Sequence, residues 1–270
     1  MDSKYEKVHF RYPVDDIEQK GKAILTLIDC IKENNPHLYK AFKEQYPTEY
    51  LECLREEKVF IDEIEFMNQQ QNILFLQDVR DVASYLYNYY IGLASEVILR
   101  NIILAGRYYC VRAGGDKDFT LGMVSTEPDL YLPYNNKYIE IKTSSFVNGR
   151  YSALIKEKQL KYYKEKDCVI LYMDYISLPG KIFLTYVNAK DIPGSSSILV
   201  NEKECIKVDF SENVFYELDF TTPSSNKLIA SSYRINSKGF LNQHRLFPFN
   251  FFYMNKFLIA ERDLAYKQLN

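Results

Sequence analysis

The sequence Pro128-Asp-Leu-Tyr-Leu-Pro-Tyr-Asn-Asn-Lys-Tyr-Ile-Glu-Ile-Lys-Thr143 decides the fold that we predict for this chain. Residues 129–134 alternate between apolar and polar positions as a half-buried strand does, and residues 137–143 alternate again. Asn135 and Asn136 stand between the two runs and suit a tight turn, because asparagine tolerates a positive φ. The stretch therefore predicts a β-hairpin.

The hairpin sorts its side chains by face. Glu140 and Lys142 share one face of the second strand, while Ile139 and Ile141 point to the other face and into a core. Asp129 stands at the start of the paired strand, across the turn from Glu140. Its carboxylate reaches the face of Glu140 only where strand pairing is irregular, so we expect a bulge or bend near Pro128.

These residue types suit a magnesium site. Mg²⁺ prefers oxygen ligands and keeps several waters, so one or two carboxylates and a substrate phosphate are enough to hold it. Asp129 and Glu140 can hold the ion, and the backbone carbonyl of Ile141 can add a third ligand. Lys142 can orient an attacking water or stabilise negative charge on the transition state. A Glu-x-Lys pattern also occurs on solvated strand faces. The pattern alone does not distinguish a catalytic pair from a solvated face, so the surrounding sequence is needed.

Upstream, residues 81–105 carry apolar side chains at helical spacing and end before Gly106. Glu96 is an acid inside this apolar helix, and glutamate rarely stays buried without a partner. Two interpretations remain open for it. Glu96 pairs with Arg100 at i,i+4 on a solvated stripe, or it faces the site directly or through a metal-bound water.

Downstream, residues 152–166 predict a basic amphipathic helix, and residues 167–176 predict a buried strand. Gln159 and Tyr163 fall on one face of the helix, where the amide of Gln159 can bind a phosphate or the water shell of a metal. Lysines of the helix can contact DNA phosphates. For any single lysine, a solvated helix face is the better account. The lysines in question are Lys156, Lys158 and Lys161.

Four motifs in this order carry a resemblance to a known family. They are Gly92-x-x-x-Glu96 on a helix, Pro128-Asp129, Glu140-Ile141-Lys142 and Gln159-x-x-x-Tyr163. Over residues 81–190 the chain resembles the PD-(D/E)xK nuclease superfamily, and most of all its type II restriction endonucleases. The Gln-x-x-x-Tyr element is also typical of RecB-type nucleases.

The resemblance implies a fold, a reaction and residue roles. The fold is α/β, a restriction-endonuclease-like αβββαβ core with a mixed central sheet, and the reaction is Mg²⁺-dependent hydrolysis of DNA phosphodiesters. By resemblance, Asp129 and Glu140 are metal ligands and Lys142 is the catalytic lysine. Glu96 is an accessory acid and Gln159 a helper residue.

The rest of the chain divides around this core. Residues 1–80 predict a helical N-terminal region, with helices over 17–33 and 49–70, that forms a dimer interface, a lid or the completion of the core. Residues 81–190 form the nuclease core. Residues 191–270 form a C-terminal extension that is rich in strands and loops and can read DNA.

Within that extension, residues 231–256 predict a sequence-reading loop. Arginine, asparagine and glutamine read guanine and adenine edges bidentately in the major groove, although polar loops also occur on many protein surfaces. The candidate DNA-binding residues are Arg234, Lys238, Asn242, Gln243 and Arg245.

Composition limits the setting of this protein. The 270 residues are 47% hydrophobic, enough for one large domain or two small ones, and the net charge of −2 means that any DNA surface is local. The five cysteines are dispersed and odd in number, which favours reduced thiols in the cytoplasm. The three histidines are far apart, which disfavours a zinc site. No apolar run approaches membrane-spanning length, so we expect no membrane partner.

Three functions remain open from the sequence. We favour a sequence-specific endonuclease of the restriction type that cuts double-stranded DNA as a homodimer, because two-fold protein symmetry matches a palindromic site. The second is a RecB-like repair, recombination or defence nuclease with little sequence preference. The third is a DNA-binding module whose catalytic site is vestigial.

Overall fold

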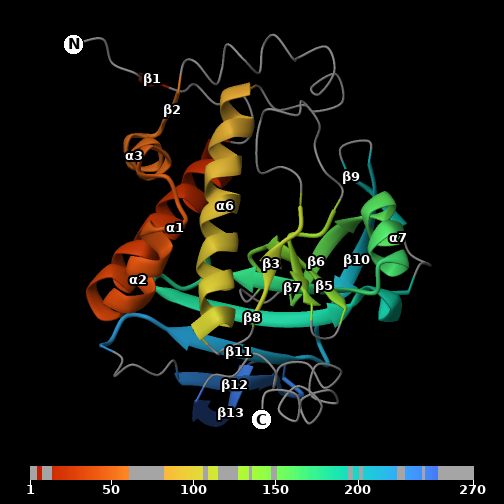
Figure 1. Cartoon of the computed structure of the whole chain (residues 1–270). Helices are drawn as coiled ribbons and strands as arrows, with labels where there is room; N and C mark the ends of the chain where they lie inside the picture. The colour runs from red at the N-terminus through yellow and green to blue at the C-terminus, as the bar shows by residue number, and fades with distance from the viewer. Residues whose placement is uncertain are drawn as a thin grey trace.

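The structure is a computed structural model of the whole chain. It describes residues 5–7, 14–60, 82–105, 109–114, 127–133, 136–146, 151–193, 197–200, 203–223, 229–238 and 241–248. Within these ranges the protein is a mixed α/β structure built on a large central sheet with helices around it (Figure 1). The expectation of an α/β fold with a mixed central sheet is therefore confirmed.

Eight strands form the central sheet, in the order β13-β12-β11-β8-β7-β5-β4-β3. The only parallel neighbours among these described strands are β5 and β7, and the other pairs are antiparallel. Their bounds are β3 Val111–Arg112, β4 Leu130–Leu132, β5 Lys137–Thr143, β7 Cys168–Asp174, β8 Lys181–Asn188, β11 Val214–Asp219, β12 Ile229–Ile235 and β13 Leu241–Pro248.

The predicted hairpin is confirmed as β4 and β5, which pair from Leu130↔Ile139 to Leu132↔Lys137. Asn136 in the turn has a φ of 52°, the left-handed conformation for which asparagine suits a tight turn. The predicted buried strand after it is also confirmed, because every residue of β7 is buried. The sheet thus holds β5 between a short antiparallel partner and a long buried parallel one.

Helix α6, Val82–Ala105, covers one face of the sheet and confirms the predicted helix over 81–105. Three N-terminal helices pack beside it, and tyrosine hydroxyls join them: Tyr46 donates to the carbonyl of Tyr90 at 2.9 Å, and Tyr87 to that of Leu54 at 3.1 Å. In the described part of residues 1–80, helices therefore complete the core on this face. They are α1 Val14–Asn34, α2 Pro36–Lys43 and α3 Thr48–Glu56.

The predicted helix over 49–70 is wrong in its extent. Helix α3 ends at Glu56, and Glu57 takes the left-handed conformation at φ 54° that caps it. The chain then enters the short strand β2, Lys58–Phe60, which pairs with β1, Tyr5–Lys7. Residues 61–81 lie outside the described ranges. A left-handed residue stops a helix because its carbonyl and amide leave the helical direction.

The predicted helix over 152–166 is also wrong in its first third. Ser152–Lys156 is strand β6, and the helix α7 covers only Glu157–Glu165. Strand β6 pairs with β10, Lys203–Asp209, which also pairs with β9, Ser197–Val200, in a separate three-stranded sheet. Backbone pairing with β10, more than forty residues downstream, decides the conformation here, and Lys156 becomes the last residue of a strand.

The predicted DNA-reading loop is a β-hairpin in its described part. Strands β12 and β13 pair along their length, with an irregularity between Ser232 and Tyr233, and they extend the central sheet at its far edge. On a hairpin at the edge of a sheet, every second side chain can face solvent and be polar. The polar composition of this segment therefore resembles that of a loop. Residues 249–256 of the prediction lie outside the described ranges.

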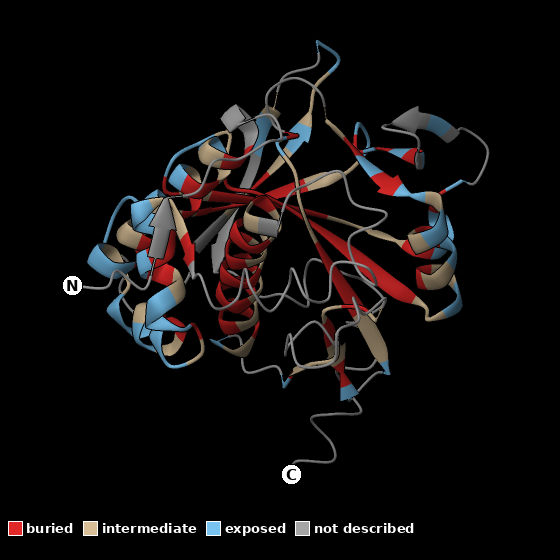
Figure 2. Cartoon of the chain, turned by 90° about the horizontal axis from the view of Figure 1, so that it is seen from above, coloured by how far each residue is buried: buried red, intermediate tan, exposed pale blue. Residues whose placement is uncertain are grey.

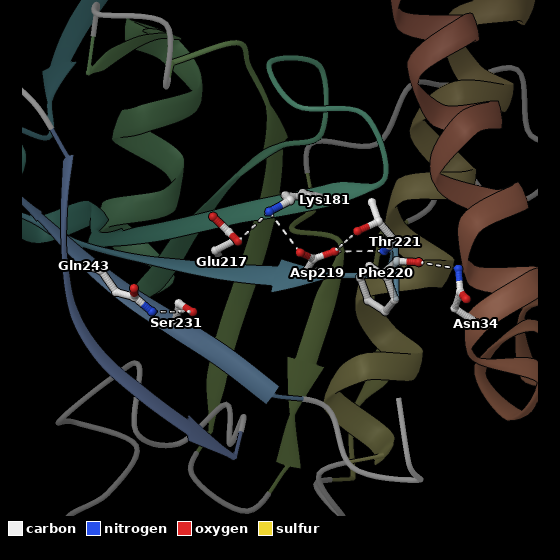
Figure 3. A network of polar contacts seen from close by, with 8 residues as sticks. All are labelled: Asn34, Lys181, Glu217, Asp219, Phe220, Thr221, Ser231 and Gln243. Atoms are coloured by element: carbon white, nitrogen blue, oxygen red, sulfur yellow. Dashed lines mark hydrogen bonds and ion pairs between the residues drawn. The ribbon is translucent and has the colours of Figure 1, made fainter. Parts of the chain in front are cut away.

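A polar network joins this half of the sheet to α1 (Figure 3). Lys181 contacts Glu217 at 3.0 Å and Asp219 at 2.9 Å, and the side chain of Asn34 donates to the carbonyl of Phe220 at 2.9 Å. Glu217 is buried and has a charged partner, so this ion pair satisfies a group that is costly to bury alone. The start of β8 and the end of β11 are thereby fixed to the helical layer.

Two apolar cores lie on the two faces of the sheet, and Figure 2 shows the buried residues concentrated in α6 and the central strands. Ile139 and Ile141 pack with α6 in one core, as the alternation of β5 predicts. Leu160 and Tyr163 of α7 pack on the other face with Tyr172 of β7. Glu140 and Lys142 of β5 thus belong to the α7 side of the sheet.

All five cysteines are free thiols. In the described ranges, no helix combines the length and the apolar character that crossing a bilayer requires.

Candidate active site

Asp129 lies where the β4–β5 hairpin stops pairing. The last cross-strand pair is Leu130↔Ile139, and the chain bends at Asp129. Instead of continuing the ladder through its backbone, Asp129 accepts the amide of Ile141 on its carboxylate, with 2.7 Å between Oδ2 and N. The expected bend beside Pro128 is therefore present. It places the carboxylate of Asp129 beside the backbone that carries Glu140.

Glu140 is held by two neighbours on the α7 side of the sheet. Only 5% of it is exposed, and its Oε1 accepts from Nζ of Lys142 two residues along the strand. The hydroxyl of Tyr163 on α7 also donates to it. The Lys142 ammonium lies 5.7 Å from the centre of the Tyr163 ring. Strand β5 and helix α7 together fix the carboxylate and the amine.

The acids at this point are close enough to affect one another. Burial raises the pKa of Asp129 well above its usual range, and the negative charges of Glu140 and Glu96 raise it further. The charge of Lys142 and the amide of Ile141 offset this only in part. Three carboxylates from α6, β5 and the start of β4 thus share one electrostatic environment.

Lys142 remains a cation in this environment. Burial by itself lowers the pKa of a lysine, but here the charges of Glu140 and Asp129 outweigh it and raise the pKa of Lys142 above its ordinary value. A protonated amine on a buried strand is therefore available to stabilise negative charge.

Glu96 faces a small cavity rather than a solvated stripe. The cavity measures about 90 Å³, and Glu96, Asp129, Arg112 and Gly92 are among its walls. Gly92 lies one turn before Glu96, and the absence of a side chain there keeps this wall open. The volume holds roughly three water molecules. Of the two interpretations left open by the sequence, the one that turns Glu96 toward the site agrees with this placement.

The partner of Glu96 is also different from the one considered. Its carboxylate pairs with Arg112 of β3 at 3.2 Å. Arg100 donates to the side chain of Gln45 at 2.6 Å. Local spacing suggested the i,i+4 pair, but β3 brings a second arginine from across the fold to the same carboxylate.

Sequence reasoning missed a fourth acid, Glu127, and the arginine that pairs with Glu96. Glu127 lines the same cavity and accepts from the Tyr162 hydroxyl at 2.6 Å, with Lys166 at 3.6 Å. Its position just before Pro128-Asp129 was the available signal. Tyr163 was already placed beside Gln159 by its four-residue spacing, whereas nothing local pointed to Arg112.

The residues predicted on α7 lie as follows. Gln159 is half-buried one turn before Tyr163, and it makes no hydrogen bond to any described residue. Its amide is therefore free to accept or donate on the face that carries Tyr163. Lys158 and Lys161 are exposed on the helix, and Lys156 is exposed at the end of β6.

The C-terminal candidates do not join this cluster. Arg234 lies on β12, four strands from β5, so roughly 19 Å separates the two strands. Asn242 and Gln243 lie one strand further, on β13. Lys238 is exposed in the turn that follows β12. The Gln243 amide donates to Ser231 at 3.2 Å (Figure 3). Arg245 belongs to β13, and its side chain lies outside the description.

The charge balance of the cluster fits a divalent cation. Among the described residues, no three His, Cys, Asp or Glu side chains are arranged to enclose a metal on their own. Mg²⁺ needs only one or two carboxylates and retains water. Asp129 and Glu140 offer those carboxylates, and burial, followed by the negative charges of Glu140 and Glu96, raises the pKa of Asp129, so a nearby cation would favour its ionised form. The carbonyl of Ile141 as third ligand stays a prediction.

Asp129 should make the metal-free protein less stable as the pH rises. A carboxyl group whose pKa is raised in the folded state contributes stability at low pH that is lost between about pH 4, where the unfolded chain ionises, and the raised pKa. We expect Asp129→Asn to remove this loss and to raise stability at pH 7 by about 1–2 kcal/mol, because one pKa unit is worth about 1.4 kcal/mol.

Urea unfolding in EDTA at several pH values measures this effect. Asp191→Asn, on an exposed site beyond β8, is the control and should leave the pH profile unchanged. An identical profile for Asp129→Asn and the wild type contradicts the crowding of carboxylates at this site.

If the chain has the nuclease activity that the sequence predicts, Glu96→Gln should reduce DNA cleavage by about 10-fold, the lower end of the loss when an outer partner of a metal site is removed. The change keeps the size of the side chain and removes its charge beside Asp129. Single-turnover cleavage in Mg²⁺ is the measurement. Glu18→Gln, which alters a helical ion pair with Lys22 on α1, should leave the rate unchanged. An unchanged rate for Glu96→Gln makes its pair with Arg112 purely structural.

No protein-family model, curated protein or solved structure matches this chain in the three comparisons made with known proteins.

Proposed function

We propose that the protein is a Mg²⁺-dependent endonuclease of the PD-(D/E)xK type that hydrolyses phosphodiester bonds in double-stranded DNA at a specific sequence. One observation carries the proposal. Asp129 accepts the amide that follows Glu140, while Glu140 binds Lys142 of the same strand, so both acids and the amine meet at one end of β5.

The order of the elements supports the proposal. Helix α6, strands β3, β4 and β5, helix α7 and strand β7 follow one another as αβββαβ, and the four strands are consecutive neighbours in the sheet. Strand β6 is inserted between β5 and α7 and belongs to the second sheet. This order supports our proposal of the restriction-endonuclease-like core that the motif resemblance implies.

The residues divide the chemistry between them. A bound Mg²⁺ polarises a phosphoryl oxygen and lowers the pKa of a bound water. Asp129 and Glu140 offer the carboxylates that hold such an ion, and Tyr163 fixes the rotamer of Glu140. Lys142, kept protonated by the neighbouring acids, stabilises the charge that develops on the phosphate. Glu96 adds negative charge beside Asp129 and orients water in the cavity.

In this proposal, two further regions of the protein bind DNA in addition to the acids of the site. Lys158 and Lys161 of α7 are close to the site in the chain and contact the phosphate backbone in this proposal. The β12–β13 hairpin, which carries Arg234 and Gln243, lies about 19–24 Å from β5 across the sheet. A duplex lying along the sheet rises about 3.4 Å per base pair, so a contact beside β5 and a contact at the hairpin are roughly six or seven base pairs apart.

A second candidate is a nuclease of the RecB-like kind with little sequence preference. The observation in its favour is the Gln159-x-x-x-Tyr163 spacing on α7, with Tyr163 in contact with the acid of the site. In this case the β12–β13 hairpin contacts DNA without reading it.

Digestion of one circular plasmid in Mg²⁺ separates the candidates. Discrete fragments support a sequence-specific endonuclease acting as a homodimer, and degradation only after linearisation supports the RecB-like enzyme. Binding of the plasmid without any cleavage in Mg²⁺ or Mn²⁺ contradicts both and supports a DNA-binding module with a vestigial site. Sequencing the cut ends gives the recognition sequence in the first case.

A further inference from the structure

A second pocket, separate from the acidic cavity, has Lys142 in its lining. Its volume is about 380 Å³, near the lower end of the range for clefts that bind small ligands. It lies between the two sheets, because Lys142 and Tyr172 are neighbours in the β5–β7 pair, and Leu154 faces Lys207 in the β6–β10 pair. The insertion of β6 and β10 therefore builds the outer wall of a pocket beside the candidate active site.

The chemistry of this pocket is that of an anion site. Lys142 contributes to one wall and Lys207 to the other, and no described acid lines it. Hydroxyl side chains complete it, so the lining offers cationic and neutral donors together. They belong to Thr143, Ser144, Ser145, Ser152 and Tyr172.

Tyr172 gives the pocket an unsatisfied donor. The residue is fully buried, its ring packs 4.8 Å from that of Phe210, and its hydroxyl has no hydrogen-bond partner among the described residues. Buried hydroxyl groups normally have a partner, and an exception asks for an explanation. Burial and the charge of Glu140 raise the pKa of this phenol, so it keeps its proton to donate.

The nearby acids already have partners of their own. Glu140 binds Lys142 and Tyr163, and Asp174 accepts from the amide of Phe146 and from the Ser177 hydroxyl. Asp209, two residues from Lys207 on β10, accepts the amide of Ser211 and stands outside the pocket lining. The lysine of the outer wall, Lys207, is exposed, and its charge helps to lower the pKa of Asp209 on the same strand.

We propose that this pocket binds a backbone phosphate of the nucleic acid adjacent to the phosphate that is cut, with Lys207 as its cationic partner and the Tyr172 hydroxyl as its buried donor. The assignment of the phosphate as the neighbour of a cut one rests on the proposed nuclease function. The pocket shares Lys142 with the site, and Lys142 binds Glu140 two residues away on β5, so a phosphate in the pocket lies beside the acidic site. The inserted sheet then positions the strand for cleavage.

Two substitutions test the pocket without touching the acids. Lys207→Gln should weaken binding of a fluorescein-labelled DNA duplex in Ca²⁺ by about 5-fold and should lower the slope of log affinity against log salt by about one. Tyr172→Phe removes one hydroxyl and should weaken the same binding by about 3-fold without changing the salt slope, because it removes no charge. Fluorescence anisotropy over a salt series measures both.

The matched control is Lys40→Gln, an exposed lysine of α2 on the helical side of the molecule. It should leave affinity and slope unchanged. Thermal melting without DNA checks folding, and Tyr172→Phe should melt no lower than the wild type, because its hydroxyl has no described partner to lose.

The outcomes separate this proposal from the nuclease proposal. If the wild type binds the duplex and both variants bind it equally well, the pocket assignment is wrong and the nuclease proposal stands. If the variants weaken binding but the wild type never cuts DNA, the pocket stands and the nuclease proposal fails. If inorganic phosphate stabilises the wild type but not Lys207→Gln while duplex affinity is the same in both, the pocket takes free phosphate and the backbone assignment is overturned.

Discussion

Replacing Glu140 with glutamine should reduce Mg²⁺-dependent DNA cleavage by at least about 10³-fold, the upper end of what the loss of one electrostatic group costs an enzyme. Glutamine keeps the size of the side chain and a hydrogen bond to Tyr163, but it removes the charge that binds both Lys142 and a metal ion. Asp129→Asn should have an effect of the same size. DNA binding in Ca²⁺ should persist in both variants, because the phosphate contacts that we propose lie on other residues.

The experiment needs both cleavage and metal binding as readouts. Single-turnover cleavage gives the rate, and stabilisation of the protein by Mg²⁺ in a thermal melt gives the metal affinity without any substrate. Both variants should lose most of the Mg²⁺-dependent stabilisation. Asp129→Asn alone should also melt higher than the wild type in EDTA, because burial and two neighbouring acids disfavour its charge.

A matched control comes from the same sheet. Glu217 is a buried glutamate that binds a lysine, Lys181, at 3.0 Å, as Glu140 binds Lys142, but it lies on β11, three strands from β5 (Figure 3). Glu217→Gln should lower stability and leave cleavage unchanged below the melting temperature. Equal loss of cleavage in Glu140→Gln and Glu217→Gln would mean that folding, not chemistry, explains the effect. Full activity in Glu140→Gln overturns its role.

Local patterns in the sequence were sufficient to predict the hairpin at the centre of the site. Strand alternation and a turn that tolerates positive φ are properties of neighbouring residues, and both appear in the structure at β4, β5 and Asn136. The bend at Asp129 followed from the adjacent proline in the same way. Long apolar segments such as α6 and β7 were equally clear, because burial imposes a period on many residues at once.

Contacts between distant segments were beyond that reasoning. Ser152–Lys156 is a strand only because β10 pairs with it, and the lysine-rich helix that follows made its pattern resemble a helix. The partner of Glu96 is Arg112, sixteen residues away, rather than the arginine at helical spacing. In each case neighbouring residues determine the local conformational preference. The arrangement of the strands then determines which distant segment or side chain lies close enough to interact.

The electrostatics of the site also divide into a part that the sequence predicts and a part that depends on the fold. Identifying Asp129, Glu140 and Lys142 as candidates required only their spacing around the turn. The burial and the crowding of acids that raise the pKa of Asp129 depend on how closely α6 approaches the hairpin. Residue types can be read from the chain, whereas electrostatic coupling depends on distances that only the fold sets.

Lys142→Gln should reduce the cleavage rate by about 10²–10³-fold, the cost of removing one preorganised group that stabilises transition-state charge. Its effect on metal binding should be the opposite of the effect of Glu140→Gln. Removing the amine leaves Asp129 and Glu140 with less positive charge beside them, so Mg²⁺ should stabilise this variant at least as strongly as the wild type. A loss of rate with retained metal binding separates the catalytic amine from the metal ligands.

The metal-free form of Lys142→Gln should be destabilised by about 3–5 kcal/mol, because Glu140 remains buried and loses its charged partner. Lys181→Gln is the control, since it leaves the buried Glu217 without its lysine while the site is untouched. Both variants should melt lower in EDTA, but Mg²⁺ should restore stability only to Lys142→Gln, where the ion replaces the missing charge beside Glu140. If Mg²⁺ restores neither variant, Glu140 does not face a cation site, and the cluster around β5 is structural rather than catalytic.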